Sequence, residues 1–197
     1  MKIAVMSDIH GNINALEAVL ADATEKGAEE FWNLGNTVSF GAFHEEVVSA
    51  LSEDSFFSTV GVYDMKVMDG ASRARKLKKR DITKKGKRLG FIKKHLSGSA
   101  RKYIESLPDR RSLVIDGKTV LAVHGSIEPL LASINAYTPM DEFSGIMQVL
   151  NTDIILCWVP GESFIKESDG KLFINPGSVG LSDDGNSKAS YAMLVIS

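Results

Sequence analysis

The feature that most constrains the fold is an alternation of short apolar runs with amphipathic stretches over residues 2–61. Three runs have the length and composition of buried strands: residues 2–6, 30–34 and 56–60. Apolar residues at helical spacing predict a first helix around 15–23, which ends at Gly27, and a second around 47–51. This order predicts parallel strands joined by crossover helices, and therefore an α/β fold.

The second half of the chain has a different pattern. Helices are predicted at 87–96, 99–107 and 141–150, and Gly98 separates the first two. Strands are predicted at 113–115, 119–124, 154–158, 164–166, 172–174 and 191–196. The dipeptides Asp116-Gly117 and Asp169-Gly170 are hairpin signals, so we expect these later strands to pair mostly antiparallel. The absence of a linker or internal repeat indicates one domain, 1–197, with mixed sheets.

Composition indicates a protein of a reducing compartment. The single cysteine, Cys157, excludes an internal disulfide framework. The start of the chain lacks the long apolar region of a signal peptide, and no run reaches the roughly 18 apolar residues that span a bilayer. We therefore expect a cytoplasmic protein without a membrane partner.

Charge is distributed unevenly along the chain. From Arg73 to Arg88, ten of sixteen residues are Lys or Arg and only Asp81 is acidic, which leaves 13 basic and 24 acidic residues elsewhere. Such a cationic segment on an acidic body is most simply a solvated helix or loop. Nucleic acid is the alternative partner, although no aromatic residue interleaves with the charges. Arg73 and Lys76 are candidate contacts for a phosphorylated ligand.

Polar or glycine motifs follow the predicted strands. Asp8-Ile9-His10 comes directly after the first strand, at the edge of a parallel sheet where ligands bind, and its two side chains can chelate one metal ion. The other strand ends carry Leu34-Gly35-Asn36, Gly61-Val62-Tyr63-Asp64, Val123-His124-Gly125 and Asn175-Pro176-Gly177-Ser178. The Asp8-Ile9-His10 motif alone is a weak signal of a metal site, but the ordered set of motifs at the strand ends is a specific pattern.

In the order and separation of these motifs, the chain resembles the calcineurin-like metallophosphoesterases, and within them the small single-domain prokaryotic branch. The resemblance extends over nearly the whole chain. It implies a four-layer αββα sandwich, in which two mixed β-sheets are flanked by helices. It also implies a hydrolase in which two divalent cations bind a phosphate ester and activate a water molecule.

The resemblance implies seven metal ligands, and this chain keeps only some of them. Asp8 and His10 match the ligands of the first ion, and His124 matches a histidine of the second. The bridging aspartate is replaced by Asn36, and the family's metal-binding asparagine by Val62. The closing Gly-His-x-His motif has become Trp158-Val159-Pro160-Gly161, without an imidazole, and we expect Trp158 to plug part of the old cleft.

These replacements predict a degenerate metal site. Each ion would keep at most two strong protein ligands, whereas catalytic zinc sites generally use three. We expect no cofactor, or one weakly held Mn, Ni or Zn ion on Asp8, His10, Asn36 and His124. The first interpretation is a protein with lost or strongly impaired catalysis that binds a phosphorylated small molecule. The alternative is an active phosphomono- or phosphodiesterase that uses one metal ion or an altered ligand set, with Glu162 as a substitute ligand.

Other residues of the motifs have candidate roles. Asp64 aligns with a family residue that orients a catalytic histidine, and it is the candidate catalytic residue here. Because Tyr63 stands in the place of that histidine, a turn-stabilising role for Asp64 is the alternative that the sequence favours. Asn175, Gly177 and Ser178 are candidate ligand-binding residues at the edge of the cleft, although a rigid turn explains them as simply. His44 and His95 fall in helical stretches outside the motifs and are expected at the surface. The sequence permits a homo-oligomer.

Overall fold

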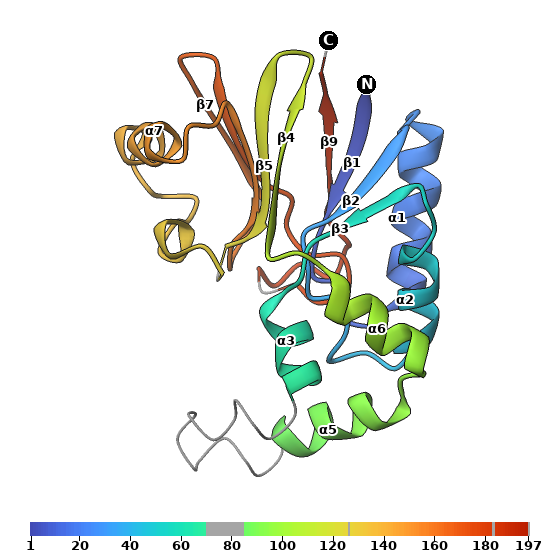
Figure 1. Ribbon diagram of the computed structural model, residues 1–197. Coiled ribbons are helices and arrows are strands. Elements are labelled where there is room, and N and C mark those ends of the chain that lie inside the picture. Colours follow the sequence, from blue (N-terminus) through green and yellow to red (C-terminus); the bar gives the residue numbers. More distant parts are fainter. Residues whose placement is uncertain (70–84, 126, 183, 197) are drawn as a thin grey trace.

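The computed structural model describes residues 1–69, 85–125, 127–182 and 184–196, and two β-sheets lie face to face at its centre (Figure 1). The first sheet has the order β3-β2-β1-β9. Its strands are β1 (Lys2–Met6), β2 (Glu30–Asn33), β3 (Phe56–Ser58) and β9 (Ala192–Val195). β1 pairs in parallel with β2, and β2 with β3, while β9 lies antiparallel to β1. The predicted parallel βαβαβ unit is confirmed.

The second sheet has the order β4-β5-β6-β8-β7. Its strands are β4 (Arg110–Ile115), β5 (Lys118–His124), β6 (Ile154–Trp158), β7 (Phe164–Ser168) and β8 (Lys171–Asn175). Both Asp-Gly hairpins form: Asp116 and Gly117 have φ of 47° and 77°, and Asp169 and Gly170 have φ of 52° and 73°. Positive φ at both central residues is typical of the type I′ turn.

The expectation that the later strands pair mostly antiparallel is borne out, since three of their five pairings among the described residues are antiparallel: β4–β5, β7–β8 and β1–β9. The parallel pairings in the second sheet were not expected. β5 pairs in parallel with β6, and β6 with β8; only the two hairpins β4–β5 and β7–β8 are antiparallel within this sheet. The reason is that α7 (Met140–Val149) carries the chain from β5 to β6 as a crossover helix. The β7–β8 hairpin then returns β8 to the free side of β6.

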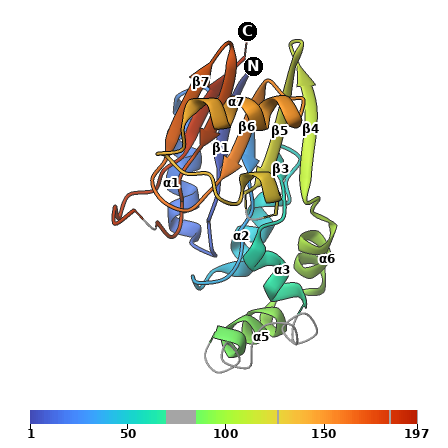
Figure 2. The same ribbon diagram turned by 90° about the vertical axis from the view of Figure 1, so that its left-hand side faces the viewer.

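Helices cover the outer face of each sheet, as Figures 1 and 2 show from two sides. The remaining described helices are α1 (Ile13–Glu25), α2 (His44–Leu51), α3 (Val62–Asp69), α5 (Lys85–His95), α6 (Gly98–Ser106) and the short 3₁₀ turn η2 (Pro129–Leu131).

The boundary between α5 and α6 differs from the prediction. Gly98 was expected to separate the two helices, but it is the first residue of α6. Ser97 is the N-cap instead, because its side chain accepts from Ala100 N–H. α3 was not predicted.

Of the four apolar clusters among the described residues, three hold the layers together. The first lies between the sheets and includes Val5, Trp32, Ala122 and Leu156. A second packs α1 and α2 on the outer face of β1, and a third packs α7 on β5, β6 and β8. The four-layer αββα arrangement expected from the family resemblance is therefore present.

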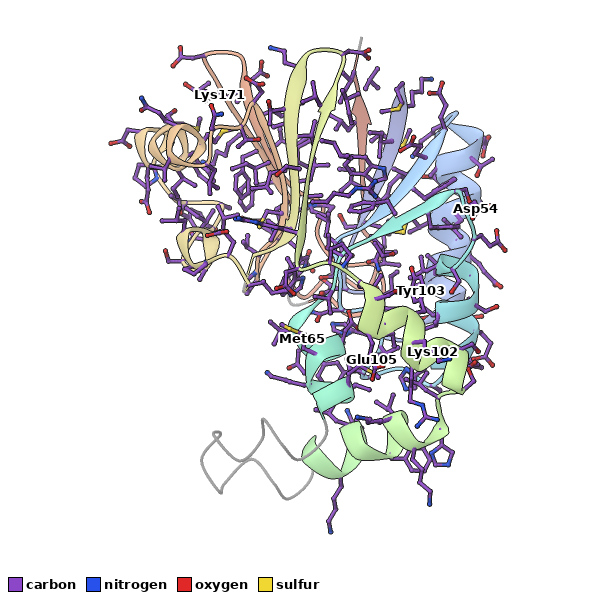
Figure 3. All side chains as sticks on the ribbon, in the orientation of Figure 1. Asp54, Met65, Lys102, Tyr103, Glu105 and Lys171 are labelled. Atoms are coloured by element: carbon purple, nitrogen blue, oxygen red, sulfur yellow. The ribbon has the colours of Figure 1, made fainter. Side chains whose placement is uncertain are left out.

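Tyr103 on α6 ties the lower helices to the first sheet (Figure 3). Its hydroxyl donates to Leu51 O at 2.7 Å and lies 3.1 Å from Ser58 Oγ. The two ends of the described chain meet at the opposite end of the molecule, where the Met1 ammonium donates to Ile196 O at 2.9 Å. Within the described ranges, no helix is long and apolar enough to cross a membrane.

Candidate functional site

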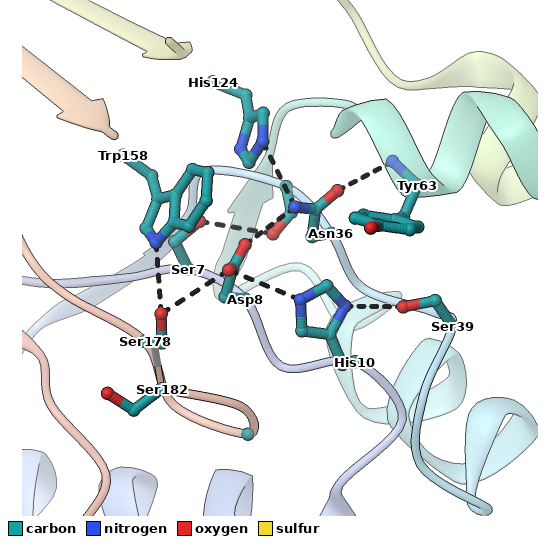
Figure 4. Close-up of polar contacts among 12 residues, drawn as sticks. Ser7, Asp8, His10, Asn36, Ser39, Tyr63, His124, Trp158, Ser178 and Ser182 are labelled. Carbon is teal, nitrogen blue, oxygen red and sulfur yellow. Dashed lines mark hydrogen bonds and ion pairs between the residues drawn. The ribbon is translucent and has the colours of Figure 1, made fainter. Parts of the chain in front are cut away.

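The polar residues of the sequence motifs meet where the strands of both sheets end (Figure 4). Asp8 and His10 follow β1, and Asn36 follows β2. His124 and Trp158 are the last residues of β5 and β6, and they are register partners across the parallel pair. The two sheets thus contribute opposite sides of one centre, as strand ends in α/β folds commonly do.

The backbone of this centre is held in an uncommon conformation. Asp8, His10 and Asn36 have φ of 55°, 52° and 56°, in the left-handed region that non-glycine residues visit rarely. Hydrogen bonds between the two loops hold this conformation, because Asp8 N donates to Gly35 O at 3.0 Å and His10 N to Asn36 O at 2.9 Å. Strain of this kind is concentrated at functional sites, and here it aims three polar side chains at one point.

The Asp8 carboxylate is buried and has polar side chains on three sides. Asn36 Nδ2 donates to Oδ1 at 2.8 Å, while His10 Nε2 lies 3.3 Å from Oδ2. Ser178 Oγ donates to Oδ2 over 3.4 Å. The other ring nitrogen of His10 lies 2.7 Å from Ser39 Oγ, so both nitrogens of this imidazole have a partner.

His124 is fully buried, and its tautomer follows from its contacts. Nδ1 lies 3.1 Å from Leu34 O, which can only accept, so Nδ1 carries the proton. Nε2 therefore presents its lone pair to Asn36 Nδ2 at 3.1 Å. Burial lowers the pKa of His124 to about 4, so the ring is neutral at pH 7.

Trp158 lies flat on His124. The ring centroids are 4.7 Å apart, and the planes differ by 8°. The indole Nε1–H donates to Ser178 Oγ at 3.2 Å, and Ser178 in turn contacts Asp8. The indole thus fills the end of β6 and connects the second sheet to the Asp8 side of the centre.

A cavity of about 330 Å³ opens above these residues, so Trp158 fills only part of the space. Its floor contains Asp8, His10, Asn36 and His124, and its walls and rim contain Phe40, Val62, Tyr63, Lys66, Trp158, Pro160 and Leu181. Phe40 and Tyr63 pack edge to face at 4.9 Å, and Lys66 Nζ lies 4.9 Å from the centre of the Tyr63 ring. The cavity therefore has a polar floor, aromatic walls and a cation at its rim.

Asp64 lies beneath the cavity and is fully buried. Its two carboxylate oxygens accept from Val38 N and Gly61 N, each at 2.9 Å. Burial raises its pKa to about 6, although these backbone hydrogen bonds act in the opposite direction. The residues that line the cavity, among those the structure describes, do not include Asp64, and its contacts tie the Asn36 loop to the start of α3.

The other predicted site residues are placed as follows. Asn175 uses its amide on Val159 O, Glu162 O and Gly177 N, so it holds the turn after β8. Glu162 is exposed.

The other predicted residues lie away from the cavity or outside the described ranges. Arg73 and Lys76 lie outside the described residues. His95 is at the surface, as expected. His44 is half-buried instead: Gly11 packs against its ring, and its buried Nδ1 has no hydrogen-bond partner among the described residues.

Sequence reasoning missed Ser39, Phe40, Lys66 and Leu181 as parts of the site. Ser39 and Phe40 belong to the motif that contains Asn36, and this neighbourhood was the one available signal. Lys66 lies one helical turn after Val62, at i+4, so the unpredicted helix α3 is what brings it to the rim. Among the described residues, no three His, Cys, Asp or Glu side chains are grouped so that they could hold a metal ion.

Comparison with known proteins agrees with this fold. Residues 1–197 match the family model of the calcineurin-like phosphoesterase superfamily domain. An uncharacterized protein of Methanocaldococcus jannaschii is 30% identical over 208 aligned residues, which cover 97% of this chain and 81% of that protein. The crystal structure of a metallophosphoesterase from Sphaerobacter thermophilus matches with a TM-score of 0.71 and 27% identity, over 99% of this chain and 84% of that one. A hypothetical protein from Pyrococcus horikoshii matches in fold with a TM-score of 0.76 and 23% identity, over 91% and 77% of the two chains.

Proposed function

Because this chain belongs to the calcineurin-like phosphoesterase superfamily, we propose that it keeps the cleft of a phosphoesterase as a binding site and has lost two-metal hydrolysis. The observation that carries this proposal is the Trp158 ring, which lies 4.7 Å from the His124 ring and parallel to it. It lies at the strand end where the family resemblance implies histidine ligands. Neither an indole nor the following Val159 offers a lone pair to a divalent cation.

Two divalent cations do not fit the residues of this centre. Asn36 directs its amide N–H groups toward Asp8 and His124, so it presents hydrogens where a bridging carboxylate would present oxygen. Val62 adds only hydrocarbon at the position of a further ligand. Two cations about 4 Å apart repel each other strongly, and a bridging anion is what offsets this repulsion.

The ligand that fits best is a small phosphorylated molecule whose phosphoryl group lies at the rim. The Asp8 carboxylate at the floor repels an anion when no cation neutralises it. Among the described residues that line the cavity, Lys66 is the cation, and Phe40 and Tyr63 offer apolar walls for the rest of such a ligand. The phosphoryl group would therefore bind near Lys66, farther out than in a metal-dependent enzyme.

Calorimetric titration with phenyl phosphate in EDTA tests this proposal. Wild-type protein is expected to bind, and Lys66→Ala to bind about tenfold more weakly, because a hydrogen bond to a charged group contributes about 1.5–3 kcal/mol. Lys102→Ala is the matched control, since Lys102 is exposed on α6 and does not line the cavity. Equal weakening by both variants, or no binding by the wild type, would remove the ligand from this cleft.

A one-metal phosphoesterase is the second candidate. It is favoured by Asp8 and His10, whose Oδ2 and Nε2 atoms lie only 3.3 Å apart on the floor of the cavity. Hydrolysis of bis(4-nitrophenyl) phosphate with Mn²⁺, Ni²⁺ or Zn²⁺ separates the two functions. Turnover that requires metal and is abolished in Asp8→Ala would establish the enzyme and overturn the binding protein. We expect no turnover above that of Asp8→Ala.

A further inference from the structure

The side-chain amide of Asn36 lies between the two halves of the centre. Its Nδ2 is 2.8 Å from Asp8 Oδ1, on the first sheet, and 3.1 Å from His124 Nε2, on the second. An amide nitrogen has two hydrogens, and each of these atoms takes one. Asn36 is 1% exposed, so water does not compete for these contacts.

The orientation of the amide is fixed by its other end. Tyr63 N–H donates to Asn36 Oδ1 at 2.8 Å, and a backbone N–H can only donate, so the oxygen must face Tyr63. On the other side, His124 Nδ1 is committed to Leu34 O, which leaves Nε2 as an acceptor. Every donor in this chain of contacts meets an acceptor (Figure 4). The contacts therefore fix both the orientation of the Asn36 amide and the tautomer of His124.

We propose that the Asn36 amide does internally what two cations would do in the family's site: it links the Asp8 side to the His124 side. The NH₂ group is an electropositive centre that satisfies the carboxylate and the imidazole at once. The centre of this protein is therefore complete without metal. This inference concerns how the centre is held together, and it does not depend on which phosphorylated ligand the cleft binds.

A metal ion would have to undo this arrangement. To offer oxygen to a cation, the amide would have to turn over and place its NH₂ against Tyr63 N–H, donor against donor. That would lose the hydrogen bond from Tyr63 N–H to Asn36 Oδ1 and the two contacts of Asn36 Nδ2, which is unfavourable at a site where Asn36 is buried. The wild-type centre is thus expected to reject a cation even though Asp8, His10 and His124 are at hand.

The same geometry predicts that one substitution changes the behaviour of the centre. Asn36→Asp replaces the two N–H groups by a second carboxylate beside Asp8, and it leaves His124 Nε2 without a donor. Two carboxylates and a neutral imidazole that face one another are a favourable ligand set for a divalent cation. The variant should therefore be unstable alone and stabilised by metal, because a ligand that binds only the folded state raises its stability.

Thermal unfolding of metal-free protein, with and without 1 mM MnCl₂ or ZnCl₂, tests the proposal. Wild type should change its Tm by no more than about 1 °C on addition of metal. Asn36→Asp should lose about 5 °C in the absence of metal and regain at least that amount with Mn²⁺ or Zn²⁺. A stoichiometric metal-dependent rise in the wild type, or a variant that folds and shows no response to either ion, would overturn the proposal.

Asn33→Asp is the matched control. Asn33 is also a buried asparagine beside the same loop, and its Nδ2 donates to Thr37 Oγ1 at 2.9 Å, away from the histidines. This variant should lose stability without any gain from metal. If Asn36→Asp fails to fold, the ¹⁵N shifts of His124 in the wild type decide: they should report an Nδ1–H tautomer that stoichiometric Zn²⁺ leaves unchanged. A shift of Nε2 on addition of Zn²⁺ would overturn the proposal, whereas loss of phenyl phosphate binding alone would contradict only the proposed ligand.

Discussion

His124 and Trp158 are register partners at the ends of adjacent parallel strands, and their rings stack with centroids 4.7 Å apart. Both are buried, with exposed fractions of 0% and 6%. The stack therefore closes the end of the second sheet at the point where the two sheets meet. Aromatic contacts of this kind contribute about 0.5–1.5 kcal/mol beyond the area they bury.

Trp158→Ala is expected to lower the free energy of unfolding by about 3–5 kcal/mol, because it removes a large buried ring and leaves a cavity. Trp158→Phe retains a smaller ring for the stack and removes the N–H that donates to Ser178, so it should cost less than the alanine variant, about 1–2 kcal/mol. Urea unfolding at pH 7 measures both. A cost below about 1 kcal/mol for the alanine variant would show that the ring does not pack as described.

Asp64 should make stability decrease as the pH rises from 4 to 6. Burial raises its pKa to about 6 from 3.8, so in this window the folded state binds a proton that the unfolded state has released. The contribution of Asp64 to stability is fully present below pH 4 and is lost as the pH passes 6. The difference in unfolding free energy between wild type and Asp64→Asn should fall by about 2 kcal/mol from pH 4 to pH 6. A constant difference over this range would contradict the shifted pKa.

His124 should act with the opposite sign. Burial lowers its pKa to about 4 from 6.5, so between these values the unfolded state binds a proton that the folded state excludes. Its contribution is present above pH 6.5 and is lost as the pH falls to 4. The difference in unfolding free energy between wild type and His124→Gln should fall by about 3 kcal/mol from pH 6.5 to pH 4, measured in EDTA. A difference that falls as the pH rises, as expected for Asp64→Asn, would refute the neutral buried imidazole of His124.

Much of the fold could be predicted because its signals are local. The apolar run 2–6, the helical spacing before Gly27 and the two Asp-Gly dipeptides each act over a few residues, and the structure confirms all of them. The pairing of β6 with β8 was not predictable in this way. It depends on where a hairpin returns after a crossover helix, which is a property of the assembled sheet and has no local signal.

The polar floor of the candidate site was predictable in membership and not in chemistry, whereas its walls and rim were missed. Asp8, His10, Asn36 and His124 were expected together from the order of their motifs, and they meet in the structure. The direction of the Asn36 amide was not expected, because it is set by Tyr63 N–H and by the tautomer of His124. These groups come from three segments that are distant in the sequence.

Gly180→Ala tests the packing of the loop that carries Ser178 against the site. A Cβ at this position would lie 1.9 Å from Ile9 O, a distance that no relaxation of a side chain can relieve. The backbone would have to shift and weaken the hydrogen bond from Gly180 N to Asp8 O, now 2.8 Å long. We expect a loss of about 2–4 kcal/mol in unfolding free energy, within the range of overpacked cores and broken hydrogen bonds.

Gly90→Ala is the control for this substitution. Gly90 lies within α5, and a Cβ there would meet no atom of the described residues within 4 Å. Alanine is favoured over glycine in a helix by about 0.5–1 kcal/mol, so this variant should be slightly more stable than wild type. If Gly180→Ala did not lower the free energy of unfolding, the close approach of the Ser178 loop to Ile9 would be refuted, and with it the hydrogen bond from Ser178 to Asp8.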